Sequence, residues 1–235
     1  MEYINRIFNM DCIAGMSLLP DGCVDMVLTD LPYGMTNCAW DALLPLPELW
    51  AQLNRVTKRD GAMVFTAAQP FTTTLISSNQ RNFRYCWYWY KNQVTGFQFA
   101  KYQPLRCVED VAVFYRARPT YNPQGLLALE TPRQTGTRRK GPEAYRGKLT
   151  RAYETRYTNY PRQVLTFACQ REGLNPTQKP VALFEYLVRT YTEPGQLVLD
   201  CCMGSGTTKV ACRQSGRNYV GFEIDREQYR IACER

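Results

Sequence analysis

The feature that most constrains how this chain folds is the alternation of short apolar runs with segments whose apolar residues recur at helical spacing. The short runs predict strands at 3–8, 24–29, 62–66, 85–90, 108–115, 196–200 and 218–223. The other segments predict helices at 11–19, 46–56, 70–79 and 180–191, with one more after the glycine turn near 205 and one at the end of the chain. This order indicates an α/β fold built on a largely parallel sheet.

Proline and glycine mark the boundaries between these elements. Pro180 suits the first position of a helix, because proline has no backbone N–H to leave unpaired there. Asp60 and Gly61 are expected to end the helix that begins near Leu46, before the strand at 62–66. A chain of 235 residues can bury a sizeable core, so we expect a single domain over 1–235.

The regular pattern fades between 116 and 171, where we expect a loop-rich insertion. Within it, 131–162 carries nine Lys and Arg against two Glu, and this excess accounts for most of the net charge of +8. Tyrosines lie among the charges, which suits phosphate contacts combined with base stacking, although a solvated loop is the alternative. The candidate polyanion-binding residues are Arg133, Arg138, Arg139, Lys140, Arg146 and Lys148.

Histidine is absent from the chain, and this excludes mechanisms that use an imidazole base or an imidazole zinc ligand. The ten cysteines form no CxxC pair, so free thiols in a reducing compartment are expected, and no metal site. No apolar run approaches the roughly 20 residues that span a bilayer. We expect a cytoplasmic protein with no membrane partner.

A candidate cofactor site follows the predicted strand at 196–200. That strand ends in Asp200, and Gly204 and Gly206 then allow a ligand to approach the backbone where the next helix begins. Glu223 ends the following strand, where a carboxylate can accept hydrogen bonds from ribose hydroxyls. Neither the Walker pattern nor the dinucleotide fingerprint is satisfied, because Lys209 comes too late and a third glycine is missing. A nucleoside cofactor without phosphates, S-adenosylmethionine, fits better.

A second candidate site is the run Asp30-Leu31-Pro32-Tyr33, which follows the strand at 24–29. An aromatic amine is a poor nucleophile because its lone pair is delocalised, and two acceptors on its hydrogens relieve this. The Asp30 carboxylate and the Leu31 carbonyl can serve as these acceptors, and Pro32 biases Leu31 toward an extended conformation. Tyr33 offers a ring face for an extruded base. The alternative interpretation of this run is structural, namely that Asp30 and Pro32 only shape the turn in which the chain leaves the strand.

These residues resemble the amino-methyltransferases that act on DNA, whose motifs are Asp/Asn/Ser-Pro-Pro-aromatic and Phe-x-Gly-x-Gly. The order of motifs is similar to the β group of that family, with the catalytic motif first, a variable recognition segment next, and then Asn175 to Pro180 and the cofactor glycines. The resemblance implies direct methyl transfer from S-adenosylmethionine to N6 of a flipped-out adenine in double-stranded DNA. It also implies a Rossmann-like, circularly permuted, mostly parallel seven-stranded sheet, and it makes the basic insertion the DNA-facing region. The resemblance also makes a homodimer an expectation, which nothing else in the sequence supports.

The resemblance further assigns the site residues. The catalytic residues are Asp30, Leu31, Pro32 and Tyr33. The cofactor-binding residues are Asp11, Thr177, Gln178, Lys179, Asp200, Gly204, Ser205, Gly206, Thr207 and Glu223. Three positions depart from the family motifs, namely Leu31 for the first proline, Cys202 for phenylalanine and Asn175 for histidine.

Three other functions remain open at this stage. N4 methylation of cytosine uses the same geometry, and Asp at position 30 favours adenine because the cytosine enzymes more often resemble Ser-Pro-Pro. A nicotinamide-dependent oxidoreductase on a Rossmann sheet is a rival from another enzyme class. A DNA-binding protein with a decayed methyltransferase site is the rival without catalysis.

Overall fold

The computed structural model describes residues 2–35, 41–135, 153–170 and 178–235. The chain forms two compact units, the larger made of Met1–Asn122 with Gln163–Arg235 and the smaller of Pro123–Arg162. Within the described ranges, no helix has the length and apolar character needed to cross a membrane.

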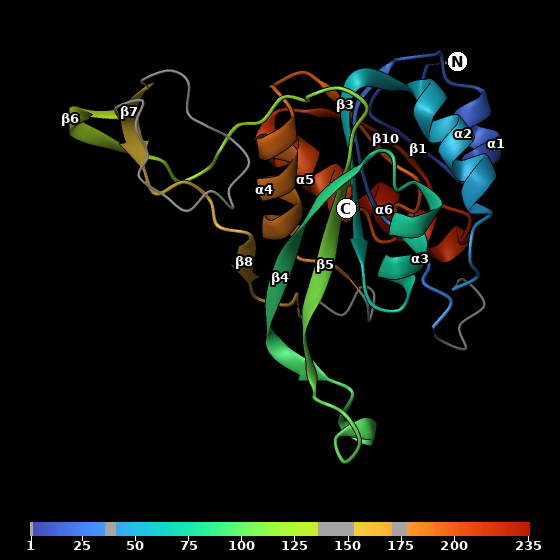
Figure 1. The fold of residues 1–235 in the computed structure, drawn as a ribbon. Coiled ribbons are helices and arrows are strands. Elements are labelled where there is room, and N and C mark those ends of the chain that lie inside the picture. Colours follow the sequence, from blue (N-terminus) through green and yellow to red (C-terminus); the bar gives the residue numbers. More distant parts are fainter. Residues whose placement is uncertain (1, 36–40, 136–152, 171–177) are drawn as a thin grey trace. The chain divides into compact units, whose positions relative to one another are not determined.

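The larger unit contains an eight-stranded sheet flanked by helices (Figure 1). Its strands are β1 (Arg6–Phe8), β2 (Val24–Asp30), β3 (Thr57–Ala67), β4 (Phe83–Thr95), β5 (Arg106–Phe114), β8 (Val164–Phe167), β9 (Leu197–Asp200) and β10 (Asn218–Phe222). Its helices are α1 (Cys12–Ser17), α2 (Leu46–Val56), α3 (Phe71–Ser78), the short 3₁₀ helix η1 (Phe97–Phe99), α4 (Val181–Tyr191), α5 (Thr207–Ser215) and α6 (Arg226–Glu234).

The strand order is β1-β10-β9-β2-β3-β5-β4-β8, and all neighbours pair in parallel except those that involve β5. The expected mostly parallel sheet is confirmed, but it has eight strands where seven were expected. The additional strand is β8, which pairs with the outer side of β4. Its four residues lie inside the segment 116–171 that the sequence assigned to a loop-rich insertion. So short an apolar run does not stand out from its surroundings by periodicity alone.

Two clusters of buried side chains cover the two faces of the sheet. One contains Met16, Leu53 and Leu75 and therefore joins α1, α2 and α3 to the sheet. The other contains residues of α4, α5 and α6, of which Leu187 and Ala232 are fully buried. The sheet is thus the middle layer of three, as expected when amphipathic helices pack on both faces of a mostly parallel sheet.

Helix α2 ends at Val56, and β3 begins at once at Thr57, five residues earlier than the predicted strand at 62–66. The pairing of β2 with β3 jumps from Val24↔Thr57 to Met26↔Ala62, so residues between these pairs bulge out of the ladder. A Cβ at Gly61 would lie 2.7 Å from the Asp25 carbonyl oxygen. Asp60 and Gly61 therefore mark a bulge within a strand, where glycine permits close backbone contact, and they do not end the helix.

The smaller unit contains two antiparallel strands, β6 (Leu127–Thr135) and β7 (Tyr153–Thr158). Its boundaries fall inside the segment 116–171. Gly125 and Asn159 join the two chain ends of the unit through a hydrogen bond of 2.7 Å from the Asn159 side chain to the Gly125 carbonyl.

Candidate active site

The carboxyl ends of the parallel strands bring the candidate residues to one edge of the sheet. Asp30 ends β2, Asp200 ends the neighbouring β9, and Glu223 directly follows β10. Asp11 lies just after β1, the next strand along. Ligands of open α/β sheets bind at this edge, so the topology gathers both candidate sites in one region.

The Asp30 carboxylate is the centre of a hydrogen-bond network. Its Oδ1 accepts hydrogen bonds from the Tyr33 hydroxyl at 2.7 Å and from the Thr66 hydroxyl at 2.5 Å. Its Oδ2 accepts a hydrogen bond from Lys179 Nζ at 2.6 Å. These three donors fix the orientation of a side chain that is otherwise a quarter exposed, with 26% of its surface accessible.

Lys179 lies buried between two carboxylates. Its Nζ is 3.6 Å from Oε2 of Glu109, whose Oε1 accepts a hydrogen bond of 3.0 Å from Lys91. Burial disfavours the charged form of Lys179, but the charges of Asp30 and Glu109 outweigh burial and raise the pKa of Lys179. Lys179 is therefore a fixed positive charge between Asp30 at the end of β2 and Glu109 of β5.

The loop that follows β2, residues 31–35, is held by Asp41, a buried residue that the sequence patterns did not single out. The Asp41 carboxylate accepts hydrogen bonds from three successive backbone amides, those of Tyr33 at 2.7 Å, Gly34 at 2.8 Å and Met35 at 2.8 Å. Charge-assisted hydrogen bonds of this kind are stronger than neutral ones. They fix the backbone that follows Pro32.

Tyr33 is engaged on its ring as well as at its hydroxyl. One side of the ring stacks on Phe71, with centroids 5.2 Å apart and an interplanar angle of 20°. Lys179 Nζ lies 5.6 Å from the ring centroid. Burial, together with the charges of Asp30 and Glu109, raises the pKa of Tyr33 well above its usual value. The phenol therefore stays protonated and acts as a hydrogen-bond donor to Asp30. Stacking of a base on Tyr33 stays a prediction.

Asp200 and Glu223 shape the glycine turn that follows β9. The Asp200 carboxylate accepts hydrogen bonds from the Cys202 amide at 3.0 Å and from the Thr208 hydroxyl. The Glu223 carboxylate accepts hydrogen bonds from the amides of Gly204 at 2.7 Å and Asp225 at 2.8 Å. Burial raises the pKa of Asp200 to about 7, and it also raises the pKa of Glu223.

Gly206 begins α5 with φ of +86°, a conformation that favours glycine. A Cβ there would lie 3.2 Å from Cα of Ala232, so Gly206 permits the close approach of α6. The sequence predicts that this glycine lets a ligand approach the backbone, whereas the structure gives it a packing role against α6. Lys209 turns to the same helix, donating hydrogen bonds to the carbonyls of Ala232 at 2.8 Å and Cys233 at 2.9 Å, where it complements the C-terminal end of α6.

A small pocket lies between Asp30 and the glycine turn. Of the predicted cofactor residues it brings together Gln178, Lys179, Asp200, Gly204, Ser205 and Thr207. Asp11, Gly206 and Glu223 are outside its lining, and Asp11 instead caps α1 by accepting a hydrogen bond of 2.9 Å from the Ala14 amide. Thr177 and Asn175 lie outside the described residues. The pocket brings these predicted cofactor residues directly beside Asp30, the predicted catalytic carboxylate.

Comparison with known proteins identifies the chain. The sequence model of a family described as DNA methylase matches residues 24–234. The chain belongs to this DNA methylase family. The family methylates N6 of adenine or N4 of cytosine and uses S-adenosylmethionine. This chain is therefore a DNA amino-methyltransferase that uses S-adenosylmethionine.

Curated relatives align over nearly the whole DNA methylase chain. The Type II methyltransferase M1.MboII of Moraxella bovis is 27% identical, covering 97% of this chain and 94% of its own. The DNA adenine methyltransferase YhdJ of Escherichia coli K12 is 26% identical, covering 97% of this chain and 81% of its own.

Solved structures share the fold. The M1.HpyAVI–SAM complex has a TM-score of 0.65 at 23% identity, covering 97% of this chain and 98% of the other. The cytosine-N4-specific PvuII DNA methyltransferase has a TM-score of 0.72 at 16% identity, covering 97% of this chain and 84% of the other.

Three residues of the DNA methylase site escaped the sequence analysis: Thr66, Glu109 and Asp41. Thr66 could have been found, because it is the last residue of the strand predicted at 62–66, and in the structure it pairs in register with Asp30. Glu109 carries no comparable signal, since it lies near the start of β5 and not at a strand end.

Two of the residues that depart from the family motifs, Leu31 and Cys202, contribute to packing, one as a buried side chain and the other as a partly buried one. Leu31 is buried, at 3% exposure, and Cys202 packs against the core cluster of α1, α2 and α3. The cysteines in the described part of the chain are free thiols, as expected.

Of the predicted DNA-binding residues, the structure describes only Arg133. It lies exposed in β6, opposite Thr155 of β7. The others lie outside the described residues, namely Arg138, Arg139, Lys140, Arg146 and Lys148.

Proposed function

We propose that this DNA methylase transfers the methyl group of S-adenosylmethionine to N6 of a flipped-out adenine in double-stranded DNA. The observation that carries the proposal is the Asp30 carboxylate, held by three donors at the wall of the pocket that contains the predicted cofactor residues. A carboxylate offers roughly four acceptor positions. Three are occupied, so one remains for a hydrogen of the target amine.

In the proposed mechanism, Asp30 and the Leu31 carbonyl each accept one hydrogen of the amine. This localises the nitrogen lone pair, which otherwise spreads into the aromatic ring. The amine must lose a proton when it gains a methyl group, and Asp30 is the group placed to accept it. Lys179 and Tyr33 hold the carboxylate in position, and Asp41 fixes the loop that follows it and contains Tyr33.

The lining of the pocket suits S-adenosylmethionine in its chemistry, and this cofactor supplies an electrophilic methyl group carried on a sulfonium. The Asp200 carboxylate favours the positive charges of this cofactor, whereas Asp30 at the wall of the pocket is paired with Lys179 and is assigned to the amine. Gly204, Ser205 and Thr207 lie at the start of α5, where helix amides favour a carboxylate. We propose that these residues hold the cofactor, with Gln178 and Lys179.

The ionisation of Asp200 gives a pH test of this cofactor assignment. Because burial raises the pKa of Asp200 to about 7, much of it is protonated below neutral pH and loses its attraction for a cationic ligand. Affinity for S-adenosylmethionine should therefore fall as pH drops from 8 to 6, by about tenfold per pH unit at most. Titration calorimetry at several pH values measures this, and Asp200→Asn is expected to flatten the dependence. An unchanged pH dependence in that variant would remove Asp200 from cofactor binding.

The choice of adenine over cytosine rests on Asp30 and on YhdJ, a relative named as a DNA adenine methyltransferase. N4 methylation of cytosine is the second candidate, because PvuII methyltransferase, which is cytosine-N4-specific, shares the fold. Nucleoside mass spectrometry of DNA from cells that express the chain is expected to detect N6-methyladenine. Detection of N4-methylcytosine alone would refute the adenine proposal and leave amine methylation intact. Sequencing of the modified bases would give the target sequence.

We also propose that residues 131–162, the basic segment, contact DNA phosphates. Replacing Arg138, Arg139 and Lys140 with glutamine should weaken DNA binding and flatten its salt dependence, by roughly one unit of log–log slope per lost phosphate contact. Affinity for S-adenosylmethionine should not change. Fluorescence anisotropy of labelled duplex DNA at several salt concentrations measures the slope, and an unchanged slope would make the segment a solvated loop.

A further inference from the structure

Strands β4 and β5 continue beyond the edge of the sheet that carries Asp30. The pairing of β3 with β5 stops at Ala67↔Asp110, whereas β4 and β5 remain paired through Tyr90↔Val108 to Thr95↔Arg106. This extension, residues 90–108, forms a hairpin arm that projects from the body of the larger unit (Figure 1). It begins where Glu109 contacts Lys179, at the catalytic network.

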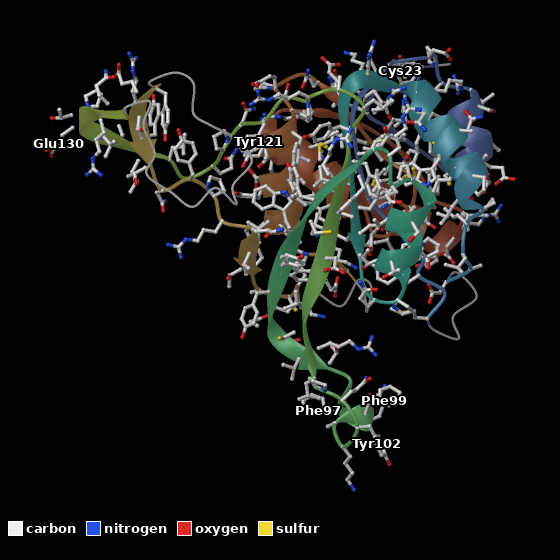
Figure 2. All side chains as sticks on the ribbon, in the orientation of Figure 1. Cys23, Phe97, Phe99, Tyr102, Tyr121 and Glu130 are labelled. Atoms are coloured by element: carbon white, nitrogen blue, oxygen red, sulfur yellow. The ribbon has the colours of Figure 1, made fainter. Side chains whose placement is uncertain are left out.

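The tip of the hairpin arm exposes three aromatic side chains. Phe97 is 66% exposed, Phe99 is 43% exposed and Tyr102 is 86% exposed. Figure 2 shows them projecting from the end of the arm, away from the core. A water-soluble surface rarely keeps a cluster of large apolar side chains exposed unless a partner covers it.

The tip is a folded turn. Gly96 has φ of +92°, and the amides of Phe99 and Tyr102 donate hydrogen bonds to the carbonyls of Gly96 at 2.9 Å and Phe99 at 2.8 Å. The aromatic side chains are thus presented on a backbone that is already ordered. A partner that binds them has less conformational entropy to remove.

The charge of the hairpin arm indicates the kind of partner. Residues 90–108 contain no Asp or Glu, and Lys101 and Arg106 are exposed. A cationic surface with exposed aromatic rings suits a nucleic acid, since cations contact phosphates and any base can stack on an aromatic ring. The arm also lies at the edge of the sheet where a base must enter to reach Asp30.

We propose that the hairpin arm is a second DNA-contacting element, separate from the basic segment, whose aromatic tip stacks on bases of the duplex beside the methylated base. This inference rests on the proposed function, because it takes duplex DNA as the substrate. Extruding a base leaves a gap in the stack, and aromatic or apolar side chains that enter a duplex stabilise such unstacked states.

The test compares the wild-type protein with the triple variant Phe97→Ala, Phe99→Ala, Tyr102→Ala. We expect the variant to bind duplex DNA about tenfold more weakly or worse, with an equal rise in the KM for DNA and unchanged affinity for S-adenosylmethionine. Leu18→Ala is the matched control, because Leu18 is also an exposed apolar residue, at 54% exposure, and it lies at the C-terminal end of α1 and not in the hairpin arm. It should leave DNA affinity unchanged.

Two further variants separate the stacking contribution from charge and guard against misfolding. Lys101→Gln with Arg106→Gln should flatten the salt dependence of DNA binding, whereas loss of the aromatic rings should lower affinity at an unchanged slope. Tyr102→Ser, at the most exposed position, should weaken binding, and Tyr102→Trp should preserve it.

Unchanged DNA affinity in the triple variant and in Tyr102→Ser would overturn the inference. So would a wild-type dimer that the triple variant converts to a monomer in sedimentation, because the tip would then be a contact between copies of the chain. Failure of the wild-type protein to methylate unmethylated duplex DNA is a different result, and it would refute the proposed function itself.

Discussion

Asp30→Ala is expected to abolish nearly all methyl transfer while S-adenosylmethionine still binds. The substitution removes the acceptor that polarises the amine and takes its proton, and groups in this role typically contribute about 10²–10⁴-fold to the rate. The cofactor should still bind because the glycine turn is held by hydrogen bonds to Asp200 and Glu223, which do not involve Asp30. Transfer of labelled methyl groups to unmethylated DNA measures the first effect, and titration calorimetry measures the second.

Two further variants sharpen the Asp30 experiment. Asp30→Asn keeps one acceptor oxygen and the shape of the side chain, so it should lose less activity than Asp30→Ala. Asp21→Asn is the matched control, because Asp21 is an exposed carboxylate just before β2 that pairs with Arg55 at 2.6 Å. Its rate should stay at the wild-type level. Retained activity in Asp30→Ala would remove Asp30 from the mechanism.

The sequence predicted the catalytic carboxylate because Asp30 ends the strand that contains the apolar run Met26–Leu28 and stands two residues before Pro32. It could not predict the partner of that carboxylate. Lys179 lies 149 positions further along the chain, and the resemblance assigned it to the cofactor alone. Their contact depends on the strand order, which sets the start of α4 beside the end of β2. Periodicity in the sequence does not encode that order.

Glu109 illustrates a second limit of the sequence. Side chains at the ends of parallel strands are expected to meet at one edge, and this reasoning located Asp30, Asp200 and Glu223. Strand β5 runs antiparallel, so the residues near its beginning lie at that edge. An apolar run predicts a strand but not its direction. For the same reason, apolar runs alone do not predict that residues 90–108 extend beyond the edge as a paired arm.

Lys179→Met should destabilise the fold strongly and reduce the rate of methyl transfer. Without Lys179, the carboxylates of Asp30 and Glu109 lose the cation between them, and Glu109 is left with its ion pair to Lys91. Removing one partner of a buried ion pair typically costs about 3–5 kcal/mol, and the lower part of this range applies because Asp30 is partly exposed. Urea unfolding at neutral pH measures the loss. The rate should fall because Asp30 loses one of the three contacts that orient it.

Lys58→Met is the matched control for this experiment. Lys58 pairs with Asp25 of the same strand β2 at the same distance, 2.6 Å, as Lys179 pairs with Asp30. The lysine side chain of that pair is 47% exposed, whereas that of Lys179 is 8% exposed. Asp25 is itself only 10% exposed, but it keeps a hydrogen bond of 2.8 Å from the Leu197 amide and solvent reaches the lysine. Lys58→Met should therefore cost less stability than Lys179→Met and leave the rate unchanged. Equal losses of stability in the two variants would mean that burial between Asp30 and Glu109 gives Lys179 no special role, and the ion-pair network would then have to be dropped from the mechanism.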